Sequence, residues 1–398
     1  MSHETSLIFM LTSGFVAAFL FGMVALRLKL SPLLGYLAAG AVVGPFTPGF
    51  VADRSAAGQF AEVGVILLMF GVGLHFSPKD LLSVRRVALP GALLQIGLGV
   101  GLGWAAGGLL GLPTGEALLL GLALSVASTV VVLRVLEARH ETKSEIGRIA
   151  VGWLVVQDLV VVLALVFLPL FLDPAGATPT QLAVKVTLQV GKLIAFVGLM
   201  FVVGGRVLPW ALVSIAHARS RELFTLGVLA IALGIAWVAY AVFGASFALG
   251  AFVAGLVLNG THIGHNAAER SLPLRDAFAV LFFVSVGMLF DPGVVMRAPL
   301  HLALVLGIVI AAGAGAALLA ARLSKVAWGK TALLAAALPQ VGEFSFVLAG
   351  LAVSLGLMTH QTQGLIVAAA ILSIAVNPVL LWIADRASRS SPSGGGGR

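Results

Sequence analysis

Long apolar runs separated by short polar breaks constrain this chain more than any other feature. Thirteen runs approach the 17–25 residues that a helix needs to cross a bilayer. They lie near 6–26, 32–49, 57–74, 87–110, 115–136, 146–168, 186–209, 221–241, 244–260, 272–290, 299–321, 331–356 and 362–384. Only 10% of the residues are charged, against about 25% in a soluble domain. The sequence therefore predicts an all-α polytopic membrane protein.

Composition excludes several other classes. The chain has no cysteine, which excludes disulfides, thiolate metal sites and cysteine nucleophiles. Its net charge of +8 does not indicate nucleic-acid binding, because the basic residues are dispersed through short loops. No phosphate-binding loop, dinucleotide fingerprint or catalytic triad occurs, so we expect neither an enzyme nor a cofactor. We expect a membrane domain over 1–386 and a disordered tail or linker over 387–398.

The distribution of basic residues predicts the orientation of the chain. Of the 24 lysines and arginines, 20 lie in the loops after odd-numbered runs or in the tail, and 3 lie after even-numbered runs. Cytoplasmic loops of membrane proteins carry the excess of basic residues. The N-terminus is therefore predicted outside, and the C-terminus in the cytoplasm.

A weak internal repeat relates the two halves of the chain. Residues 34–43 match residues 249–258 at an offset of 215, and residues 73–78 match residues 287–292 at an offset of 214. The matching runs are seven spans apart, so they cross the membrane in opposite directions. Runs one to six and eight to thirteen thus predict an inverted repeat, which is typical of transporters.

The repeat also predicts two interrupted helices. Pro339 and Gly342 both oppose helix formation in the middle of 331–356. Subtracting 214 from Gly342 gives Ser128, so 115–136 should break there as well. Such paired breaks form the substrate site of inverted-repeat transporters. The residues expected at the two crossing breaks are Ser125, Ser128 and Thr129 in the first, and Pro339, Gln340, Gly342 and Glu343 in the second.

One carboxylate, Asp158, lies about halfway along the run 146–168. A charge at the bilayer centre costs about 2.5–3.5 kcal/mol, and acids placed there usually line ion or proton paths. A structural acid bonded to a neighbouring hydroxyl is the alternative. A carboxyl group that is either protonated or cation-bound couples the two ions by competition, and one acid predicts electroneutral exchange. The adjacent Gln157 cannot titrate, and cation coordination and interhelical hydrogen bonding are both open to it.

Six motifs together resemble the monovalent cation:proton antiporter-2 family, in its Kef-type branch. The resemblance covers nearly all of residues 6–386. The motifs are SPLLGYLAAGAVVGP (31–45), AEVGVILLMFGVGLHFSP (61–78), VVQDLVVV (155–162), ALGAFVAGLVL (248–258), SLPLRDAFAVLFFVSVGMLFDP (271–292) and PQVGEFSFVLAG (339–350).

The resemblance implies a scaffold bundle that forms a homodimer and a core bundle that carries the crossed broken helices. It implies that Asp158 is the shared proton and cation site and that Gln157 is its partner. Ser128 and Thr129 would then lie beside the cation at the first crossover.

Two departures from the family pattern qualify this picture. Many sodium/proton relatives carry two acids where Gln157 and Asp158 stand, and a lysine in the eleventh span, which here reads GIVIAAGAGAALLAA (307–321). Both differences favour potassium over sodium. Kef-type systems usually continue into a cytoplasmic nucleotide-binding domain. We expect that regulatory domain to be absent, truncated or on another polypeptide.

The leading interpretation is an antiporter that exchanges a monovalent cation for protons across the inner (plasma) membrane. A sodium-coupled solute symporter, a gated cation channel and an ion sensor without net transport stay open as alternatives. The symporter is disfavoured because the sequence has no second polar cluster suited to a larger substrate.

Overall fold

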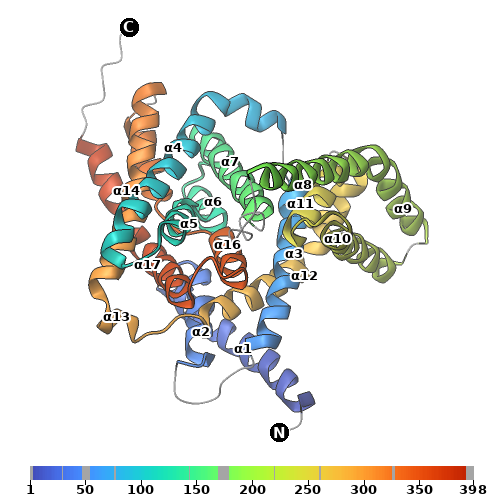
Figure 1. The fold of residues 1–398 in the computed structure, drawn as a ribbon, viewed down its shortest axis with the longest axis horizontal. Coiled ribbons are helices and arrows are strands. Elements are labelled where there is room, and N and C mark those ends of the chain that lie inside the picture. The colour runs from blue at the N-terminus through green and yellow to red at the C-terminus, as the bar shows by residue number, and fades with distance from the viewer. Residues whose placement is uncertain are drawn as a thin grey trace. The chain divides into compact units, whose positions relative to one another are not determined.

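The structure is a computed structural model that describes residues 3–28, 30–46, 54–75, 78–142, 144–168, 179–218, 220–259, 261–324 and 328–390. Every regular element within these ranges is a helix (Figure 1). Seven of the described helices are long and apolar enough to cross a membrane, and five shorter apolar helices accompany them. The prediction of an all-α polytopic membrane protein is confirmed.

Each of the predicted runs contains a helix. Single helices occupy ten of them: α1 (His3–Arg27), α2 (Pro32–Val43), α3 (Arg54–His75), α4 (Pro78–Leu110), α7 (Glu145–Phe167), α10 (Arg221–Phe243), α11 (Phe247–Leu258), α12 (His262–Gly287), α14 (Pro299–Ser324) and α17 (His360–Ser390). A short helix, α13 (Val294–Arg297), precedes α14. The seventh run continues through α8 (Pro179–Leu199), a π-helical turn η2 (Met200–Gly204) and α9 (Gly205–His217).

Several element ends differ from the expected boundaries, among them the start of α4 at Pro78 rather than 87 and the start of α12 at His262 rather than 272. Helix α2 ends at Val43 rather than 49, because Gly44 is extended, with ψ of 169°, and precedes Pro45. The residue before a proline is disfavoured in a helix. Helix α17 continues to Ser390, and 391–398 lie outside the described residues, so the tail or linker over 387–398 stays a prediction.

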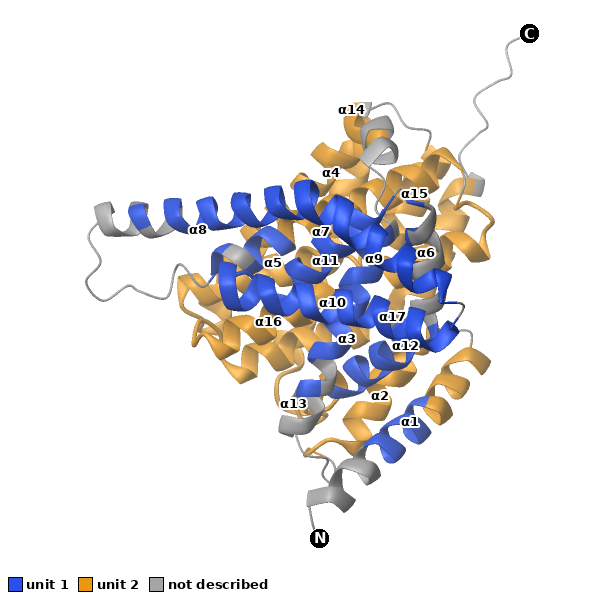
Figure 2. Cartoon of the chain, turned by 90° about the vertical axis from the view of Figure 1, so that its right-hand side faces the viewer, with its two compact units in different colours: residues 1–18, 49–77, 162–285 blue, residues 19–48, 78–161, 286–398 orange. Residues whose placement is uncertain are grey.

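The chain divides into two compact units (Figure 2). The first contains residues 1–18, 49–77 and 162–285, and includes α3 and α8 to α11. The second contains residues 19–48, 78–161 and 286–398. All of the predicted site residues belong to this second unit.

Two helix pairs in the second unit are interrupted where the sequence predicted. Helices α5 (Thr114–Ser125) and α6 (Thr129–Ala138) are separated by residues 126–128. Helices α15 (Trp328–Ala337) and α16 (Glu343–Ser354) are separated by residues 338–342. The predicted breaks near Ser128 and at Pro339–Gly342 are therefore confirmed.

The two breaks cross in direct backbone contact. The Gly342 amide donates a 2.8 Å hydrogen bond to the Val126 carbonyl, and the Ser345 hydroxyl donates a 2.6 Å bond to the Ala123 carbonyl. A Cβ atom at Gly342 would lie 2.7 Å from the Ala127 carbonyl oxygen, which is closer than real contacts allow. The crossing therefore needs glycine at position 342.

Glycine pairs also bring together segments from the two predicted repeats. In the first unit, a Cβ at Gly73 would lie 3.0 Å from the Gly255 Cα atom. In the second unit, a Cβ at Gly287 would lie 3.0 Å from the Gly40 Cα atom. The sequence repeat equates Gly40 with Gly255 and Gly73 with Gly287, so the two contacts are counterparts. In an inverted repeat, a contact between Gly73 of the first half and Gly255 of the second recurs as a contact between Gly287 of the second half and Gly40 of the first. The inverted repeat itself stays a prediction.

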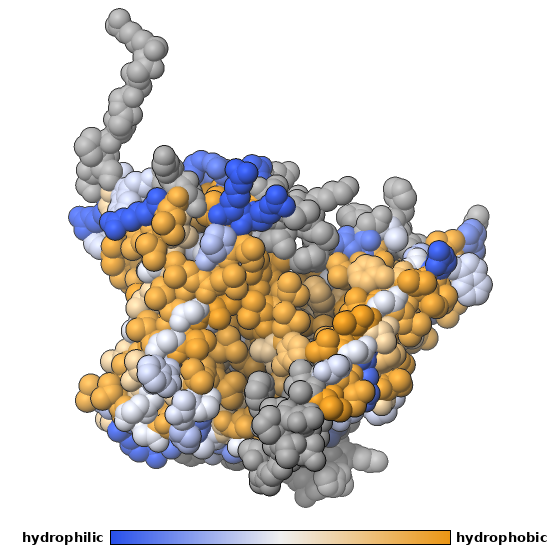
Figure 3. Space-filling view, turned by 45° about the horizontal axis from the view of Figure 1, so that its top comes forward, coloured by the Kyte–Doolittle hydropathy of each residue, from blue (hydrophilic) through white to orange (hydrophobic). Residues whose placement is uncertain are grey.

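The surface is suited to lipid. Hydrophobic residues form a broad region of the visible face, and hydrophilic residues gather along its edges (Figure 3). Leu109 is 76% exposed and Phe19 is 64% exposed, as expected where acyl chains replace water around a protein.

The glycine at the crossing gives a stability prediction. Gly342→Ala should lower the melting temperature of the detergent-solubilised protein, because overpacking against backbone costs about 1–3 kcal/mol. Gly101→Ala in α4 is the control, since a Cβ there meets no atom within 4 Å. It should leave stability unchanged or raise it, because alanine is the better helix former. Equal melting temperatures for the two variants would contradict the close crossing.

Candidate functional site

Asp158 lies in α7 with its carboxylate at the first break. It is 5% exposed, and the Thr129 hydroxyl at the start of α6 donates a 3.2 Å hydrogen bond to its Oδ2 atom. Its Oδ1 atom is buried without a hydrogen-bond partner among the described residues. Buried polar atoms are almost always bonded, so an unpartnered carboxylate oxygen needs an explanation.

Large apolar side chains fix the rotation of α7. Ile149, Trp153 and Gln157 are spaced by four residues, so they share one face of the helix, and all three are buried. The Trp153 indole donates a 2.7 Å hydrogen bond to the Gln95 side chain in α4. This packing aims Gln157, and with it Asp158, at the break between α5 and α6.

Gln157 binds the unwound backbone with both ends of its amide. The Ala127 amide donates a 3.1 Å hydrogen bond to Gln157 Oε1, and Gln157 Nε2 donates a 3.1 Å bond to the Ser125 carbonyl. The side chain is fully buried. Its expected part in cation coordination stays a prediction, while the interhelical hydrogen bonds of the alternative interpretation are present.

Ser128 and Glu343 connect the two breaks. Ser128 caps α6, where its hydroxyl accepts from the Val131 amide at 3.4 Å, and the same hydroxyl donates to Glu343 Oε2 at 3.4 Å. Glu343 is the first residue of α16 and is 4% exposed. Negative charge is favourable at a helix N-terminus, so this position stabilises an acid.

Several carbonyl groups at the broken helix ends accept hydrogen bonds. Ser125 and Val126 accept from Gln157 and from the Gly342 amide. Ala336 accepts a 2.8 Å bond from the Asn377 side chain, and Ala337 accepts a 2.8 Å bond from Gln340 Nε2. Among the buried side-chain nitrogen and oxygen atoms of the described residues, Asp158 Oδ1 and Gln340 Oε1 have no hydrogen-bond partner.

Pro339 at the second break and Ser125 at the first, both predicted from the sequence, make further contacts, as does Val341. Pro339 packs against Gly313 of α14, where a Cβ would lie 2.9 Å from the Pro339 Cα atom. The Val341 amide donates a 3.2 Å hydrogen bond to the Ser373 hydroxyl of α17. Ser125 donates its own hydroxyl to the Leu122 carbonyl at 2.7 Å, within α5.

Three buried polar residues that support the crossing were not singled out from the sequence. They are Ser345, Ser373 and Asn377. Each lies within an otherwise apolar run, and Asn377 directly precedes Pro378 inside α17. A search for polar residues inside predicted spans would have found all three.

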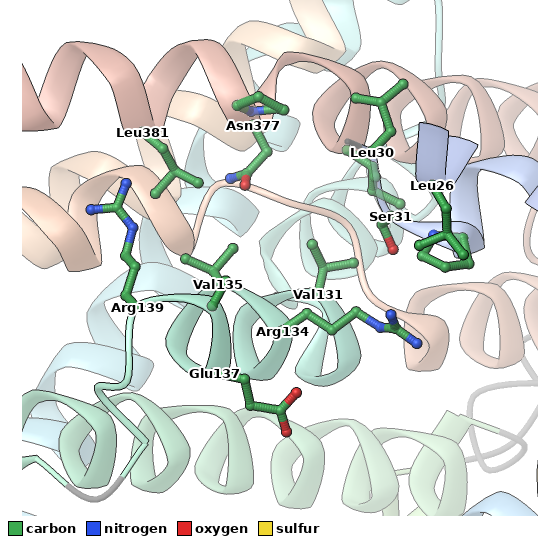
Figure 4. Close-up of a pocket in the computed structure, with 14 residues that line it drawn as sticks. Leu26, Leu30, Ser31, Val131, Arg134, Val135, Glu137, Arg139, Asn377 and Leu381 are labelled. Carbon is green, nitrogen blue, oxygen red and sulfur yellow. The ribbon is translucent and has the colours of Figure 1, made fainter. Parts of the chain in front are cut away.

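A cavity of about 700 Å³ lies beside the first break, within the second unit. Figure 4 shows Val131 and Val135 of α6 facing Asn377 and Leu381 of α17, while the Arg134 side chain, also in the lining, runs along α6. The remaining lining residues are Leu26, Leu30, Ser31, Pro32, Glu137, Ala138, Arg139, Ile374 and Pro378.

Each of the two facing cavity walls contains a residue one helical turn from a residue at the crossing. Val131 lies one turn beyond Ser128 on α6, and Asn377 lies one turn beyond Ser373 on α17. At the other end of the cavity, Arg139 forms an ion pair with Asp385 through two hydrogen bonds of 2.7 and 2.9 Å. The cavity therefore extends from this ion pair toward the break.

Broken helices that cross beside a buried carboxylate, in a polytopic helical chain, define a membrane transporter of the discontinuous-helix class. The chain belongs to the sodium/hydrogen exchanger transmembrane family, whose sequence profile matches residues 15–382. This is a family of transporters rather than of enzymes.

Relatives at higher identity bear out the Kef-type resemblance. The chain is 50% identical over 389 residues to YbaL of Escherichia coli (strain K12), whose name describes a candidate cation/proton antiporter. It is 33% identical over 377 residues to the glutathione-regulated potassium-efflux system protein KefC of Klebsiella pneumoniae. These alignments cover 97% and 94% of this chain, and 70% and 60% of the two relatives.

A solved structure shares the fold. The sodium proton antiporter MjNhaP1 of Methanocaldococcus jannaschii matches with a TM-score of 0.72 over 98% of this chain and 99% of that chain. The sequence identity is only 18%, so this similarity bears on the fold alone.

Proposed function

We propose that the chain exchanges a monovalent cation, potassium rather than sodium, for protons by alternating access, with Asp158 as the site that both ions share. The observation that carries the proposal is the buried Asp158 Oδ1 atom, which lies beside a helix break and has no hydrogen-bond partner in the described part of the chain. Thr129 holds the other carboxylate oxygen, so the unpartnered atom has a fixed position.

Competition at one carboxylate follows from its surroundings. An ionised acid in a membrane interior is costly unless it is paired, so Asp158 must hold either a proton or a cation. A proton on Oδ1 and a cation at Oδ1 exclude each other. Loading one ion therefore requires release of the other, which is the coupling that an antiporter needs.

We assign different roles to the two buried acids. Glu343 is bonded to Ser128 and lies at the N-terminus of α16, so its contacts belong to the crossing itself. Asp158 has one occupied and one free oxygen. Glu343 therefore supports the crossing, together with Pro339, Gln340 and Gly342, while Asp158 carries the exchanged ion beside Thr129 and Ser128.

Two observations support potassium as the cation. Relatives at 33–34% identity are named potassium-efflux proteins, among them K(+) efflux antiporter 4 of Arabidopsis thaliana. The middle of α14 also has no basic residue, and Gln157 occupies the position of a second acid. A homodimeric assembly and control by a cytoplasmic nucleotide-binding domain rest on the family resemblance alone.

The cavity beside α6 is the proposed cytoplasmic entrance. The bias of 20 basic residues against 3 places the ends of α6 and α17 that carry Arg139 and Asp385 on the cytoplasmic side. The same bias places the N-terminus outside and the C-terminus in the cytoplasm, in the inner (plasma) membrane.

Removing the charge of Asp158 tests the proposed site. In proteoliposomes with a preset pH gradient, Asp158→Asn should reduce potassium-dependent proton movement to the protein-free background, because asparagine cannot titrate. It can still accept the Thr129 hydrogen bond, so the melting temperature should stay close to that of the wild type. Glu62→Gln, which removes an exposed acid in α3, is the matched control and should retain exchange. Exchange by Asp158→Asn above background would refute the assignment.

Charge counting predicts electroneutral transport. One acid that loads one proton or one monovalent cation moves no net charge. A membrane potential set by a chloride gradient and a chloride-selective ionophore should therefore leave the initial rate unchanged. One net charge moving through 100 mV would change the driving force by about 2.3 kcal/mol. A rate that depends on the sign of the potential would show that another group carries charge.

The cytoplasmic entrance can be tested by thiol labelling, since the chain has no native cysteine. Val135→Cys, in the cavity wall, should react with a membrane-impermeant thiol reagent in inside-out vesicles but not in right-side-out vesicles. Leu188→Cys is the control: position 188 is 62% exposed on α8 and should face lipid, where a thiolate does not form. Labelling of Val135→Cys from the outside would place the cavity on the other face.

A further inference from the structure

The amide of Gln157 occupies an unusual position beside the proposed site. It is fully buried, one residue before Asp158, and each end of the amide bonds to backbone of the first break. Residues 126–128 lie between α5 and α6, where the regular helical hydrogen-bond pattern is interrupted. A buried backbone group left without a partner destabilises the folded state.

Helix α7 therefore holds both sides of the break through two consecutive residues. Gln157 binds the Ser125 carbonyl at the end of α5 and the Ala127 amide within the break. Asp158 binds the Thr129 hydroxyl at the start of α6. The separation between the Asp158 carboxylate and the N-terminus of α6 is set by these contacts together.

We propose that Gln157 is a positioning residue, an amide brace that fixes the first break against Asp158 and thereby sets the affinity for the cation without binding it. The inference rests on the proposed function only in taking Asp158 as the ion site. It differs from the expectation that Gln157 coordinates the cation, because both ends of its amide are used by the backbone.

Only a neutral group with one donor and one acceptor can form both contacts. A carboxylate at position 157 would accept from the Ala127 amide but could not donate to the Ser125 carbonyl. An ionised acid there would leave the Ser125 carbonyl unpaired and would add a second charge beside Asp158. The neutral amide therefore pairs with both backbone groups at the break and adds no second charge beside Asp158.

Gln157→Glu gives a test with its own internal control. A protonated glutamate has one O–H donor and one carbonyl acceptor, so it reproduces both contacts of glutamine. When it ionises, the donor is lost. Gln157→Met has a similar size but neither group, at any pH. The other titratable side chains buried at the crossing are Asp158 on α7 and Glu343 on α16, and both are present in every variant.

The measurement is the apparent potassium KM of exchange in proteoliposomes, expressed at each pH as the ratio of variant to wild type. For Gln157→Glu, the ratio of apparent KM values should be close to one at the lowest pH. It should rise about tenfold or more as the pH rises, because the ionised glutamate loses the hydrogen bond to the Ser125 carbonyl. For Gln157→Met, the ratio should be raised by a similar factor at every pH, with the maximal rate much less affected.

A ratio for Gln157→Glu that does not change with pH would overturn the brace. An unchanged KM in Gln157→Met would overturn it as well. If Gln157→Met does not yield folded protein, Gln157→Glu alone decides the question, because its predicted effect is reversible within a single preparation. Failure of the proposed function has a different signature, namely exchange that survives Asp158→Asn.

Discussion

Backbone groups that lose their helical partners inside a membrane must find others, and the interior of the second unit is arranged around that requirement. Water is not available in the hydrocarbon region, so irregular backbone is tolerated only where protein or a cavity satisfies it. Here the two breaks satisfy each other through the Gly342 amide and the Val126 carbonyl. The side chains of Gln157 on α7, Ser345 on α16 and Asn377 on α17 donate hydrogen bonds to further backbone carbonyls near the breaks.

The hydrogen bonds that the backbone forms at the two breaks limit which atoms are available to bind an ion. Several carbonyls at the breaks already accept hydrogen bonds, and Asp158 Oδ1 is a buried side-chain acceptor without a partner among the described residues. The N-termini of α6 and α16 lie close to Asp158 and Glu343, and helix N-termini favour negative charge. The crossing can thus keep an acid in a buried place while one of its oxygens stays open to a proton or a cation.

Much of this arrangement follows from sequence, for physical reasons. Apolar runs predict membrane-spanning helices because lipid replaces water around such segments. Each predicted run contains a helix. Pro339 and Gly342 identify one break through local chemistry, and the repeat offset carries it to Ser128. Ser128 and Glu343, which form a hydrogen bond, are 215 residues apart, the larger of the two repeat offsets.

Side-chain partners were not predictable in the same way. The hydrogen bond that Ser373 accepts and the one that Asn377 donates depend on how α17 packs, and no local pattern encodes that packing. The sequence left two alternatives for Gln157, because coordination and bracing both need an amide. The hydrogen bonds to the Ser125 carbonyl and from the Ala127 amide support bracing, and cation coordination by Gln157 stays a prediction.

The most direct test of the central claim is proton release on cation binding in the absence of a membrane. Potassium chloride added to the detergent-solubilised protein in unbuffered solution should release up to one proton per chain, and choline chloride should release none. Asp158→Asn should abolish the release. Binding of potassium without proton release, or release that persists in Asp158→Asn, would contradict competition between the two ions at this carboxylate.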